Sequence, residues 1–388
     1  MLRVLTLSTL FPDAARPTFG VFVERQTLGL AALPDVALQV VAPVAAPPGP
    51  LRRLGQSAGL EALPEHETWK GLTVHRPRFP SLPGIGALNP ILMARALLPR
   101  LRAIRADFPF DVLDAEFFFP DGPTAARLGR ALGVPVSIKA RGHDIHHFGR
   151  ARWSGRQVRA AGRAAGGMLA VSAALKADMV ALGLPAERIR VHYTGVDLDR
   201  FRPVADRIAA KAALGVTGPL LLSVGALIPR KGHDLAIRAL ADVPGATLMI
   251  AGKGPEHGAL AALAREVGVA DRLRLLGSQP HEALPALAAA ADVGVLVSAS
   301  EGLANAWVES LACGTPLVLS EVGGARELVD RPAAGRIVAR EPGAIAAAVR
   351  ELLAAPPDPA AVRATAARFT WEANAAALRA HLAGIVRR

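Results

Sequence analysis

The chain has 388 residues, of which 51% are hydrophobic and 20% charged. Because single cores rarely grow beyond about 250–300 residues, this length predicts two domains, and the apolar content excludes a disordered protein. The single cysteine, Cys313, excludes an internal disulfide and a cysteine zinc cluster, so we expect a cytoplasmic protein. The formal charge is +12, and residues 1–200, with 25 Lys and Arg against 16 Asp and Glu, form the more basic half.

Strand-like apolar runs alternate with amphipathic helical stretches along the first half of the chain. Because such alternation is typical of parallel sheets covered on both faces, this half is predicted to be a doubly wound domain. The first run follows Met1 closely and also fits a short signal peptide, but the absence of a small-residue cleavage site favours a buried strand. The expected strands cover residues 4–7, 36–41, 112–115, 134–138, 168–171 and 189–191.

A second series of the same kind begins at residue 220. Its expected strands cover residues 220–224, 247–251, 273–275, 293–297, 316–319 and 336–338. The α/β pattern therefore predicts two Rossmann-like domains over residues 1–197 and 219–370, joined by an interdomain linker at 198–218. A final helix over 371–388 follows the second series and is able to pack back across the first domain.

Two features bear on membranes. The longest uncharged run, residues 36–51, contains four prolines, so no membrane-spanning helix is expected there. Arg152, Arg156, Arg159 and Arg163 recur at helical spacing beside Trp153, which suits an anionic membrane surface. Only six of the 45 basic residues are lysine, so the alternative is an arginine-biased composition with solvated surface arginines.

Residues 298–316 predict a strand end, a loop and a helix. The loop carries Glu301 and Gly302, Asn305 is the expected N-cap, and Gly314 follows the helix end. The exposed amides and positive dipole end of this helix predict a diphosphate site. Glu309, one turn inside, is suited to ribose hydroxyls, and Glu301 to the sugar ring.

The Glu-x7-Glu spacing and the Ala-Cys-Gly-Thr-Pro run at 312–316 resemble the donor site of retaining GT-B glycosyltransferases of family 4. The resemblance spans almost the whole chain. It implies two Rossmann-like doubly wound domains facing a central crevice, with residues 1–197 binding the acceptor and 219–370 binding the nucleotide sugar. The alternative is an ordinary amphipathic helix with two chance glutamates.

Residues 221–234 resemble the strand-to-helix loop whose basic side chains bind the donor diphosphate in this family. Lys231 matches the family's lysine, and Ala226 stands where an arginine is usual, so we expect Arg230 to supply the second cation. A preorganised cation stabilises a leaving diphosphate by about 3 kcal/mol without a metal. Lys231, Arg230 and Glu301 are therefore the catalytic candidates of the second half.

The backbone around the donor is expected to contribute as well. Gly20 lies in an opening loop, residues 10–26, that resembles a subset of the family. This loop does not have the Gly-x-Gly-x-x-Gly spacing of dinucleotide-binding proteins, which disfavours a nicotinamide-dependent oxidoreductase. Gly252 and Gly254 follow a strand, where sharp turn geometry is the alternative reason for glycine. The predicted donor-binding set is Gly20, Gly225, Gly252, Gly254, Gly302, Leu303, Ala304, Asn305 and Glu309.

Residues 139–145 resemble the family's His-Gly-x-Asp stretch near the acceptor, with Arg141 where many members have histidine. His143 and Asp144 are the predicted contacts to the transferred sugar or to an acceptor hydroxyl, and a loop histidine paired with its neighbour is the alternative. A metal held by the histidines at 143, 146 and 147 is not favoured, because a fourth ligand is missing and the segment resembles a loop.

A rival metal site is the Asp-x-Asp pair Asp197 and Asp199, since such pairs hold a divalent metal in another glycosyltransferase fold. The pair lies in a segment that resembles the family's interdomain Asn-Gly-Val-Asp-x-x-x-Phe run, so a hinge role is favoured. We therefore expect no cofactor, no catalytic metal and no nucleic-acid partner.

These features predict hexosyl transfer with retention from a UDP- or GDP-sugar to a saccharide or lipid-linked saccharide. The opening loop and the Arg-Gly-x-Asp run resemble the subset associated with cell-surface polysaccharide and teichuronic-acid-type biosynthesis, so a peripheral place on the inner face of the cell membrane is also expected. Front-face transfer, implied by the resemblance, and double displacement both stay open. The alternatives are a sugar-nucleotide epimerase or hydrolase of the same fold and a non-catalytic, membrane-associated precursor-binding scaffold.

Overall fold

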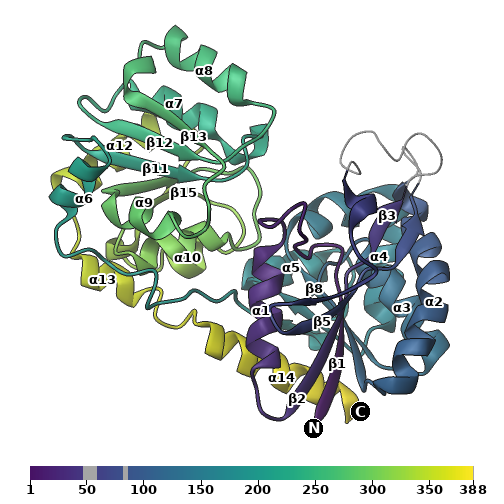
Figure 1. Ribbon diagram of the computed structural model, residues 1–388. Helices are drawn as coiled ribbons and strands as arrows, with labels where there is room; N and C mark the ends of the chain where they lie inside the picture. Colours follow the sequence, from purple (N-terminus) through teal and green to yellow (C-terminus); the bar gives the residue numbers. More distant parts are fainter. Residues whose placement is uncertain (47–58, 82–85, 388) are drawn as a thin grey trace. The chain divides into compact units, whose positions relative to one another are not determined.

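The computed structural model describes residues 1–46, 59–81 and 86–387. Contacts divide the chain into two compact units, each of them an α/β domain (Figure 1). The first comprises Met1–Thr194 and Trp371–Arg388, and the second comprises Gly195–Thr370. Residues 198–218, the expected linker, are thus part of the second unit and contain helix α6 (Arg207–Ala213).

The first unit is built on an eight-stranded sheet in the order β10-β9-β8-β7-β1-β2-β5-β4. The six predicted strands are present as parallel neighbours, which confirms the doubly wound pattern of this half. They are β1 (Leu2–Leu7), β2 (Val36–Val41), β7 (Val112–Ala115), β8 (Val136–Ala140), β9 (Gly167–Ala170) and β10 (Ile189–Val191).

One edge of this sheet was not predicted. There β5 (Leu72–His75) pairs in parallel with β2 and antiparallel with β4 (His66–Trp69), and β3 (Val44–Ala46) pairs separately with β6 (Arg78–Pro80). The hairpin turns through Lys70 and Gly71, which both have positive φ. The strands are too short and too polar to stand out in the hydropathy pattern. Residues 47–51 of the uncharged run lie outside the described part of the chain.

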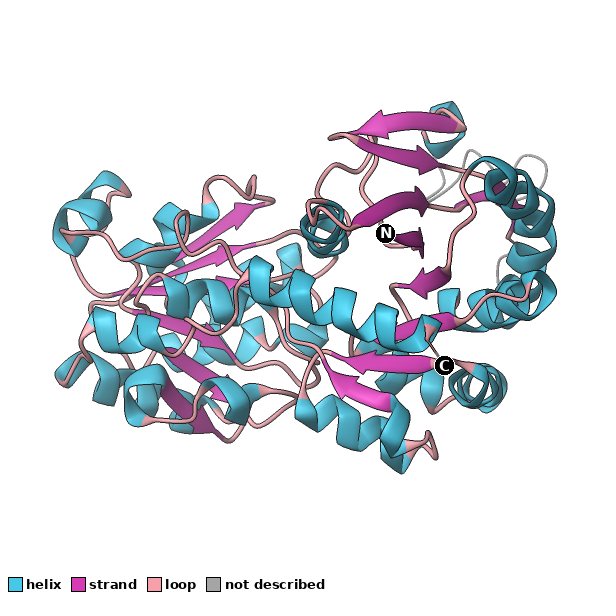
Figure 2. Cartoon of the chain, turned by 90° about the horizontal axis from the view of Figure 1, so that it is seen from below, coloured by secondary structure: helices cyan, strands magenta, loops and turns pink. Residues whose placement is uncertain are grey.

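Helices cover both faces of the first sheet, as the view in Figure 2 shows. On one face α1 packs against α14, and on the other α2 packs against α3 and α3 against α4. The helices are α1 (Val21–Ala31), α2 (Asn89–Asp107), α3 (Asp121–Leu132), α4 (Arg152–Ala164), α5 (Ala173–Ala181) and α14 (Trp371–Val386), with short turns η3 (Leu60–Ala62), η4 (Gly86–Leu88), η5 (Asp144–Gly149) and η6 (Ala186–Arg188). In the described residues no helix is both long and apolar enough for a membrane span.

The C-terminal helix α14 belongs to the first unit's core. Its buried residues recur three or four positions apart, so they form one apolar stripe. Leu378 and Leu382 pack in a buried cluster with Val4, Leu30 and Val112 from the sheet and α1. A segment about 180 residues beyond Thr194 therefore completes this domain.

The second unit has a six-stranded parallel sheet in the order β13-β12-β11-β14-β15-β16. Its predicted strands are all present, with end shifts of one or two residues. They are β11 (Leu220–Val224), β12 (Thr247–Ala251), β13 (Leu273–Gly277), β14 (Val293–Leu296), β15 (Leu317–Ser320) and β16 (Gly335–Val338). Strand order reverses between β11 and β14, which are neighbours in the sheet although β12 and β13 lie between them in sequence.

Two helical layers cover this sheet. Helix α7 packs against α8 and α12, whereas α9 packs against α6 and α10, and α10 against α13. Their bounds are α7 (His233–Leu240), α8 (His257–Glu266), α9 (Leu284–Ala290), α10 (Asn305–Ala312), α11 (Ala325–Leu328), α12 (Pro342–Ala354) and α13 (Pro359–Ala364), with short turns η7 (Pro229–Lys231), η8 (Ala270–Arg272) and η9 (Pro332–Ala334). The layers leave the carboxyl edge of the strands to the loops.

A buried carboxyl group links two loops of the first unit. Asp121, at the start of α3, accepts hydrogen bonds from the Thr9 amide at 2.9 Å and the Thr9 hydroxyl at 2.8 Å. Burial raises the pKa of Asp121 to about 7, against the effect of these two donors. The folded protein therefore holds a proton here that the unfolded chain releases above about pH 4.

We expect the unfolding free energy of the wild type to fall by about 2 kcal/mol more than that of Asp121→Asn between pH 5 and pH 7, because the unfolded state then binds fewer protons than the folded state. Urea unfolding at both pH values measures this difference. Asp107→Asn, at an exposed carboxylate, should behave as the wild type. Identical pH dependence in the wild type and Asp121→Asn would show that Asp121 does not retain this proton.

Candidate active site

The reversal of strand order in the second unit places two loops side by side at the carboxyl edge of the sheet. In open α/β sheets, ligands bind where consecutive connections depart to opposite faces. Here the loop after β11, residues 225–232, meets the loop after β14, residues 297–304. Lys231 lies on the first loop and Glu301 on the second.

Backbone contacts fix these loops against each other. The Ala299 amide donates to the Arg230 carbonyl at 2.7 Å. Gly232 has a φ of +70°, and a Cβ at this position would lie 2.4 Å from the Val297 carbonyl oxygen. A larger residue would therefore push the loops apart, so glycine at 232 is a condition for their contact.

An ion pair spans the two loops. Lys231 Nζ lies 2.5 Å from Glu301 Oε1, and the two side chains are only 18% and 11% exposed. Arg230 Nη1 lies 3.9 Å from the second carboxylate oxygen and donates to the Ser300 carbonyl at 2.8 Å. The structure thus brings together the three predicted catalytic candidates of this half. Because a partly buried charge needs a partner, an incoming anion would compete with Glu301 for Lys231.

A buried histidine supports the first loop, and the sequence analysis missed it. His233 Nδ1 lies 3.0 Å from the Ser223 hydroxyl, and its Nε2 lies 3.2 Å from the Ala226 carbonyl oxygen. Burial lowers the pKa of His233, and the nearby Lys231 charge acts in the same direction. The neutral ring therefore donates from Nε2 to Ala226 and accepts the Ser223 proton at Nδ1. His233 is the first residue of α7, directly after Gly232, and nothing in the local sequence marks its side chain as buried.

Packing explains three glycines of the predicted donor set. A Cβ at Gly252 would lie 1.8 Å from the Gly225 carbonyl oxygen, and one at Gly254 would lie 2.3 Å from that of Leu227. The Leu227 amide also donates to the Lys253 carbonyl at 3.0 Å. Gly225 packs against the Lys231 side chain, because a Cβ at position 225 would lie 3.3 Å from the side-chain carbons of Lys231. Gly252 and Gly254 must therefore be glycine for the loops after β11 and β12 to touch, whereas at Gly225 only the flexible Lys231 side chain would have to move.

Helix α10 begins one residue earlier than predicted. Asn305 is its first helical residue, and Ala304 precedes it without a side-chain cap, so the prediction of Asn305 as N-cap is wrong. The preceding loop is held from the other side, where the Gly302 carbonyl accepts from the Gly324 amide at 2.7 Å and Leu303 is buried. The amides of the first turn therefore have no side-chain acceptor from the capping position.

Glu309, the second predicted glutamate, has a specific partner. Its Oε1 lies 2.9 Å from His281 Nε2, and its side chain is 12% exposed. The His281 ring meets the edge of Phe201 at 5.3 Å between ring centres. His281 therefore fixes the direction of the Glu309 carboxylate. This histidine was missed because it lies 28 residues away in a connection without a motif.

In the first unit the structure gives Asp144 a role other than the predicted contact to substrate. Its side chain is fully buried, and its oxygens accept from the amides of Phe118 at 2.8 Å, Gly142 at 2.9 Å and Arg141 at 3.0 Å. It joins the loops after β7 and β8. His143 is exposed and stacks on His147 with 5.0 Å between ring centres. Residues 144–149 form a wide helical turn and not the loop expected from the sequence.

The backbone at position 20 also requires glycine. Gly20 precedes α1 with a φ of +69°, and a Cβ there would lie 2.2 Å from the Leu10 carbonyl oxygen.

In the rival metal pair, Asp197 Oδ1 accepts from the amides of Asp199 at 3.1 Å and Arg200 at 3.0 Å, which is a turn-forming arrangement. Across the described residues, no three His, Cys, Asp or Glu side chains are grouped so that they could hold a metal ion.

A buried polar cluster below the carboxyl edge of the first sheet was not predicted. Lys139 Nζ lies 2.7 Å from His192 Nδ1 and also donates to Gln26. Burial lowers the pKa of Lys139 to about 7. Arg141, at the position where the resemblance expects histidine, pairs with Glu116. The cluster ties α1, β7 and β8 together, so it stabilises the edge where the candidate acceptor side lies.

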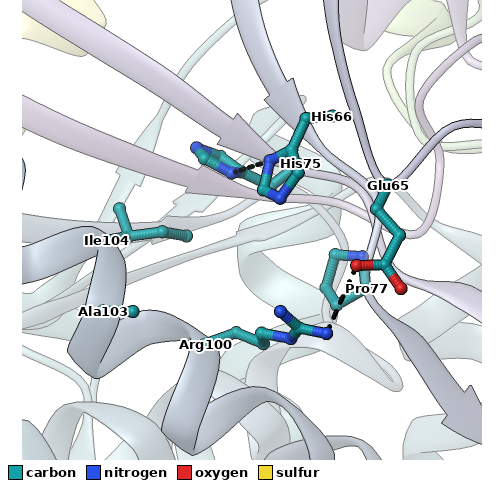
Figure 3. Close-up of a pocket in the computed structure, with 7 residues that line it drawn as sticks. All are labelled: Glu65, His66, His75, Pro77, Arg100, Ala103 and Ile104. Atoms are coloured by element: carbon teal, nitrogen blue, oxygen red, sulfur yellow. Dashed lines mark hydrogen bonds and ion pairs between the residues drawn. The ribbon is translucent and has the colours of Figure 1, made fainter.

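A separate hollow of about 140 Å³ lies beside the β4–β5 hairpin (Figure 3). His66 Nδ1 and His75 Nδ1 approach to 2.9 Å, and Arg100 of α2 pairs with Glu65 at 3.2 Å. Burial, together with His66, lowers the pKa of His75. The histidine contact joins the two strands of the hairpin, and the Arg100–Glu65 pair, more than half exposed on both sides, adds only a weak contact to α2.

Comparison with known proteins agrees with this geometry. Residues 35–200 match the family Glycosyltransferase Family 4, and residues 204–369 match Glycosyl transferases group 1. Over 211 residues, 50% of this chain, the sequence is 40% identical to the D-inositol 3-phosphate glycosyltransferase of Mycobacterium tuberculosis, and the match covers 44% of that protein. The chain thus spans less than half the length of this curated relative.

Solved structures are similar over nearly the whole chain. Sucrose-phosphate synthase from Thermosynechococcus elongatus has a TM-score of 0.78 at 20% identity, covering 100% of both chains. HepE from Anabaena in complex with UDP has a TM-score of 0.75 at 20% identity, covering 99% of this chain and 100% of the other. At this identity the likeness shows the fold. The chain is therefore a GT-B protein built of a glycosyltransferase family 4 domain and a group 1 glycosyltransferase domain.

Proposed function

We propose that the protein is a retaining glycosyltransferase that moves a hexosyl unit from a UDP- or GDP-sugar to a saccharide or lipid-linked saccharide in cell-surface polysaccharide assembly. The observation that carries this proposal is the Lys231–Glu301 pair, 2.5 Å apart where the strand order of the second sheet reverses. A cation and a carboxylate at this point suit a diphosphate and a sugar ring. Structures of HepE with UDP and with UDP-glucose support a nucleotide-sugar donor.

The leaving group determines the first chemical demand. When the bond between the anomeric carbon and the β-phosphate oxygen breaks, the electron pair stays on the phosphate. Lys231 then pairs with this phosphate in place of Glu301, and Arg230 adds a second positive charge. The first backbone amides of α10 point their dipoles at the phosphate. Such preorganised donors stabilise the transition state by about 3 kcal/mol each and need no metal.

The two glutamates then act on different parts of the donor. Glu301, released from Lys231, accepts hydrogen bonds from hydroxyls of the sugar, and Glu309, held by His281, accepts them from the ribose. The acceptor oxygen bonds to the anomeric carbon on the face that the diphosphate leaves. Because the new bond forms on the same face as the broken one, the configuration is retained. The proton of the acceptor hydroxyl passes to the departing phosphate oxygen. Double displacement through an enzyme nucleophile is the alternative route to the same configuration.

The acceptor and the cellular location rest on less specific features. Exposed arginines on α4, among them Arg152, Arg156 and Arg163, suit an anionic membrane surface, with Arg159 half-buried beside them. We propose a cytoplasmic enzyme attached peripherally to the inner face of the cell membrane, where lipid-linked acceptors are presented. D-inositol 3-phosphate belongs in the acceptor panel because a relative that shares part of this sequence is named for it.

Product analysis separates transfer from the alternatives. A transferase releases nucleoside diphosphate in step with a new glycoside. An epimerase converts the nucleotide sugar without an acceptor, a hydrolase releases free sugar, and a scaffold turns over nothing.

Lys231→Ala is expected to lose most donor affinity, because a charge-assisted contact to the diphosphate contributes about 2–3 kcal/mol, or about 30- to 150-fold. The measurement is thermal protection by UDP-, GDP-, ADP- and dTDP-sugars in the presence of EDTA. Lys176→Ala, on α5 of the first unit, is the control with the same loss of charge. Full protection of Lys231→Ala, or no protection of the wild type by any donor, would refute the donor site.

His281→Ala is expected to raise the dissociation constant of the donor about tenfold, because Glu309 loses the group that orients it. His281→Gln retains an N–H donor and should recover part of this loss. Titration with nucleoside diphosphate, together with the KM of the acceptor, measures the effect. A change in acceptor KM with unchanged donor affinity would contradict the assignment of His281 as a positioning residue for Glu309.

The first-formed glycoside from an α-linked donor should be α-linked. Proton NMR of the anomeric signal during the first turnovers measures this directly, before slow side reactions accumulate. A β-linked first product would exclude a retaining mechanism and leave the family assignment untouched.

A further inference from the structure

A cationic groove lies between α3 and α4 on the first unit, and none of the residues assigned to the donor lines it. Its volume is about 300 Å³. Three arginines line it, with no acidic residue among the lining side chains. The arginines are Arg127, Arg130 and Arg156, and three alanines of α4, namely Ala160, Ala161 and Ala164, also line the groove.

In the described part of the chain, the positive charge of this groove is not neutralised by an ion-paired carboxylate. Among the described residues, no carboxylate forms an ion pair with Arg127, Arg130 or Arg156. Arg127 donates to the Pro123 carbonyl at 2.8 Å. Burial, with the like charge of Arg130, lowers the pKa of Arg127, yet a guanidinium stays charged at neutral pH. An anion in the groove would therefore relieve repulsion and complete the hydrogen bonds.

An exposed tryptophan lies at the same helix. Trp153 is 62% exposed, and the guanidinium carbons of Arg152 and Arg156 lie 5.5 Å and 5.7 Å from its ring centre. Tryptophan with flanking arginines is typical of the boundary between water and lipid headgroups. Arg156 contacts both features, since it lines the groove and flanks Trp153. The groove and the aromatic anchor are therefore parts of one surface.

We propose that the groove between α3 and α4 binds the phosphate of an anionic membrane lipid headgroup while Trp153 enters the interface beside it. The guanidinium groups supply planar donors for phosphate oxygens, and the alanines of α4 leave the groove open enough for a headgroup. The lipid source is favoured over free phosphate and nucleic acid because a solvent-exposed tryptophan adjoins the arginines. This inference rests on the proposed membrane location and is independent of the transfer chemistry.

Flotation with phosphatidylcholine vesicles, with and without phosphatidylglycerol, tests the groove. Arg127→Gln/Arg130→Gln should lose about 150-fold in affinity for the anionic vesicles, because each arginine forms a charge-assisted hydrogen bond to the headgroup phosphate of about 1.5 kcal/mol, whereas an arginine that only lies near a membrane surface contributes about 1 kcal/mol. Arg102→Gln/Arg265→Gln, at exposed positions of α2 and α8, should leave binding unchanged. Arg152→Gln/Arg163→Gln, on α4 outside the groove lining, should lose less. Equal losses in the two α3/α4 doubles would show diffuse attraction and overturn the groove.

Two further measurements identify the occupant. Vesicles with brominated phosphatidylglycerol should quench tryptophan fluorescence of the wild type and quench Trp153→Phe much less. Soluble glycerol phosphate and a short RNA should not compete with vesicles; effective competition by either would overturn the lipid assignment. The groove double should keep full protection by the nucleotide sugar. Failure of that protection in the wild type, with vesicle binding intact, would refute the proposed transferase and leave this inference standing.

Discussion

The candidate site depends on one ion pair that the fold makes and a ligand must break. Lys231 and Glu301 lie on loops that follow neighbouring strands, and each is mostly shielded from water. Either charge alone would be costly in that setting, so the two residues neutralise each other until an anion replaces the carboxylate. In the proposed function, the same exchange prepares both groups, because it would turn Lys231 toward the diphosphate and free Glu301 for the sugar.

Close backbone contact makes this exchange possible. The loops after β11, β12 and β14 touch through Gly232, Gly252 and Gly254, where any Cβ would meet a carbonyl oxygen at 2.4 Å or less. The buried Ser223–His233 pair holds the first loop from below. In the proposed function, a frame of this kind would fix the cation and carboxylate before the donor arrives and lower the reorganisation needed in the transition state.

Most of the fold could be predicted from the sequence, because short apolar strands alternate regularly with amphipathic helical stretches along both halves of the chain. That Lys231 and Glu301 lie together was also predictable, since each lies in a local motif; the roles of these residues and of Glu309 stay predictions. His281 was not predictable, because its pairing with Glu309 depends on how α9 and α10 pack. The hairpin β4–β5 has too little apolar signal. Asp144 is a different case, because a motif match singled out the residue but suggested a contact to substrate. Its burial and its amide partners show that it joins two loops.

The most direct measurement is a crystal structure of the protein with a nucleoside diphosphate bound. We expect the β-phosphate within hydrogen-bond distance of Lys231 Nζ, the ribose hydroxyls on Glu309, and the Lys231–Glu301 contact opened from its 2.5 Å separation. A diphosphate bound elsewhere, with the ion pair intact, would contradict the central claim that this pair is the donor site.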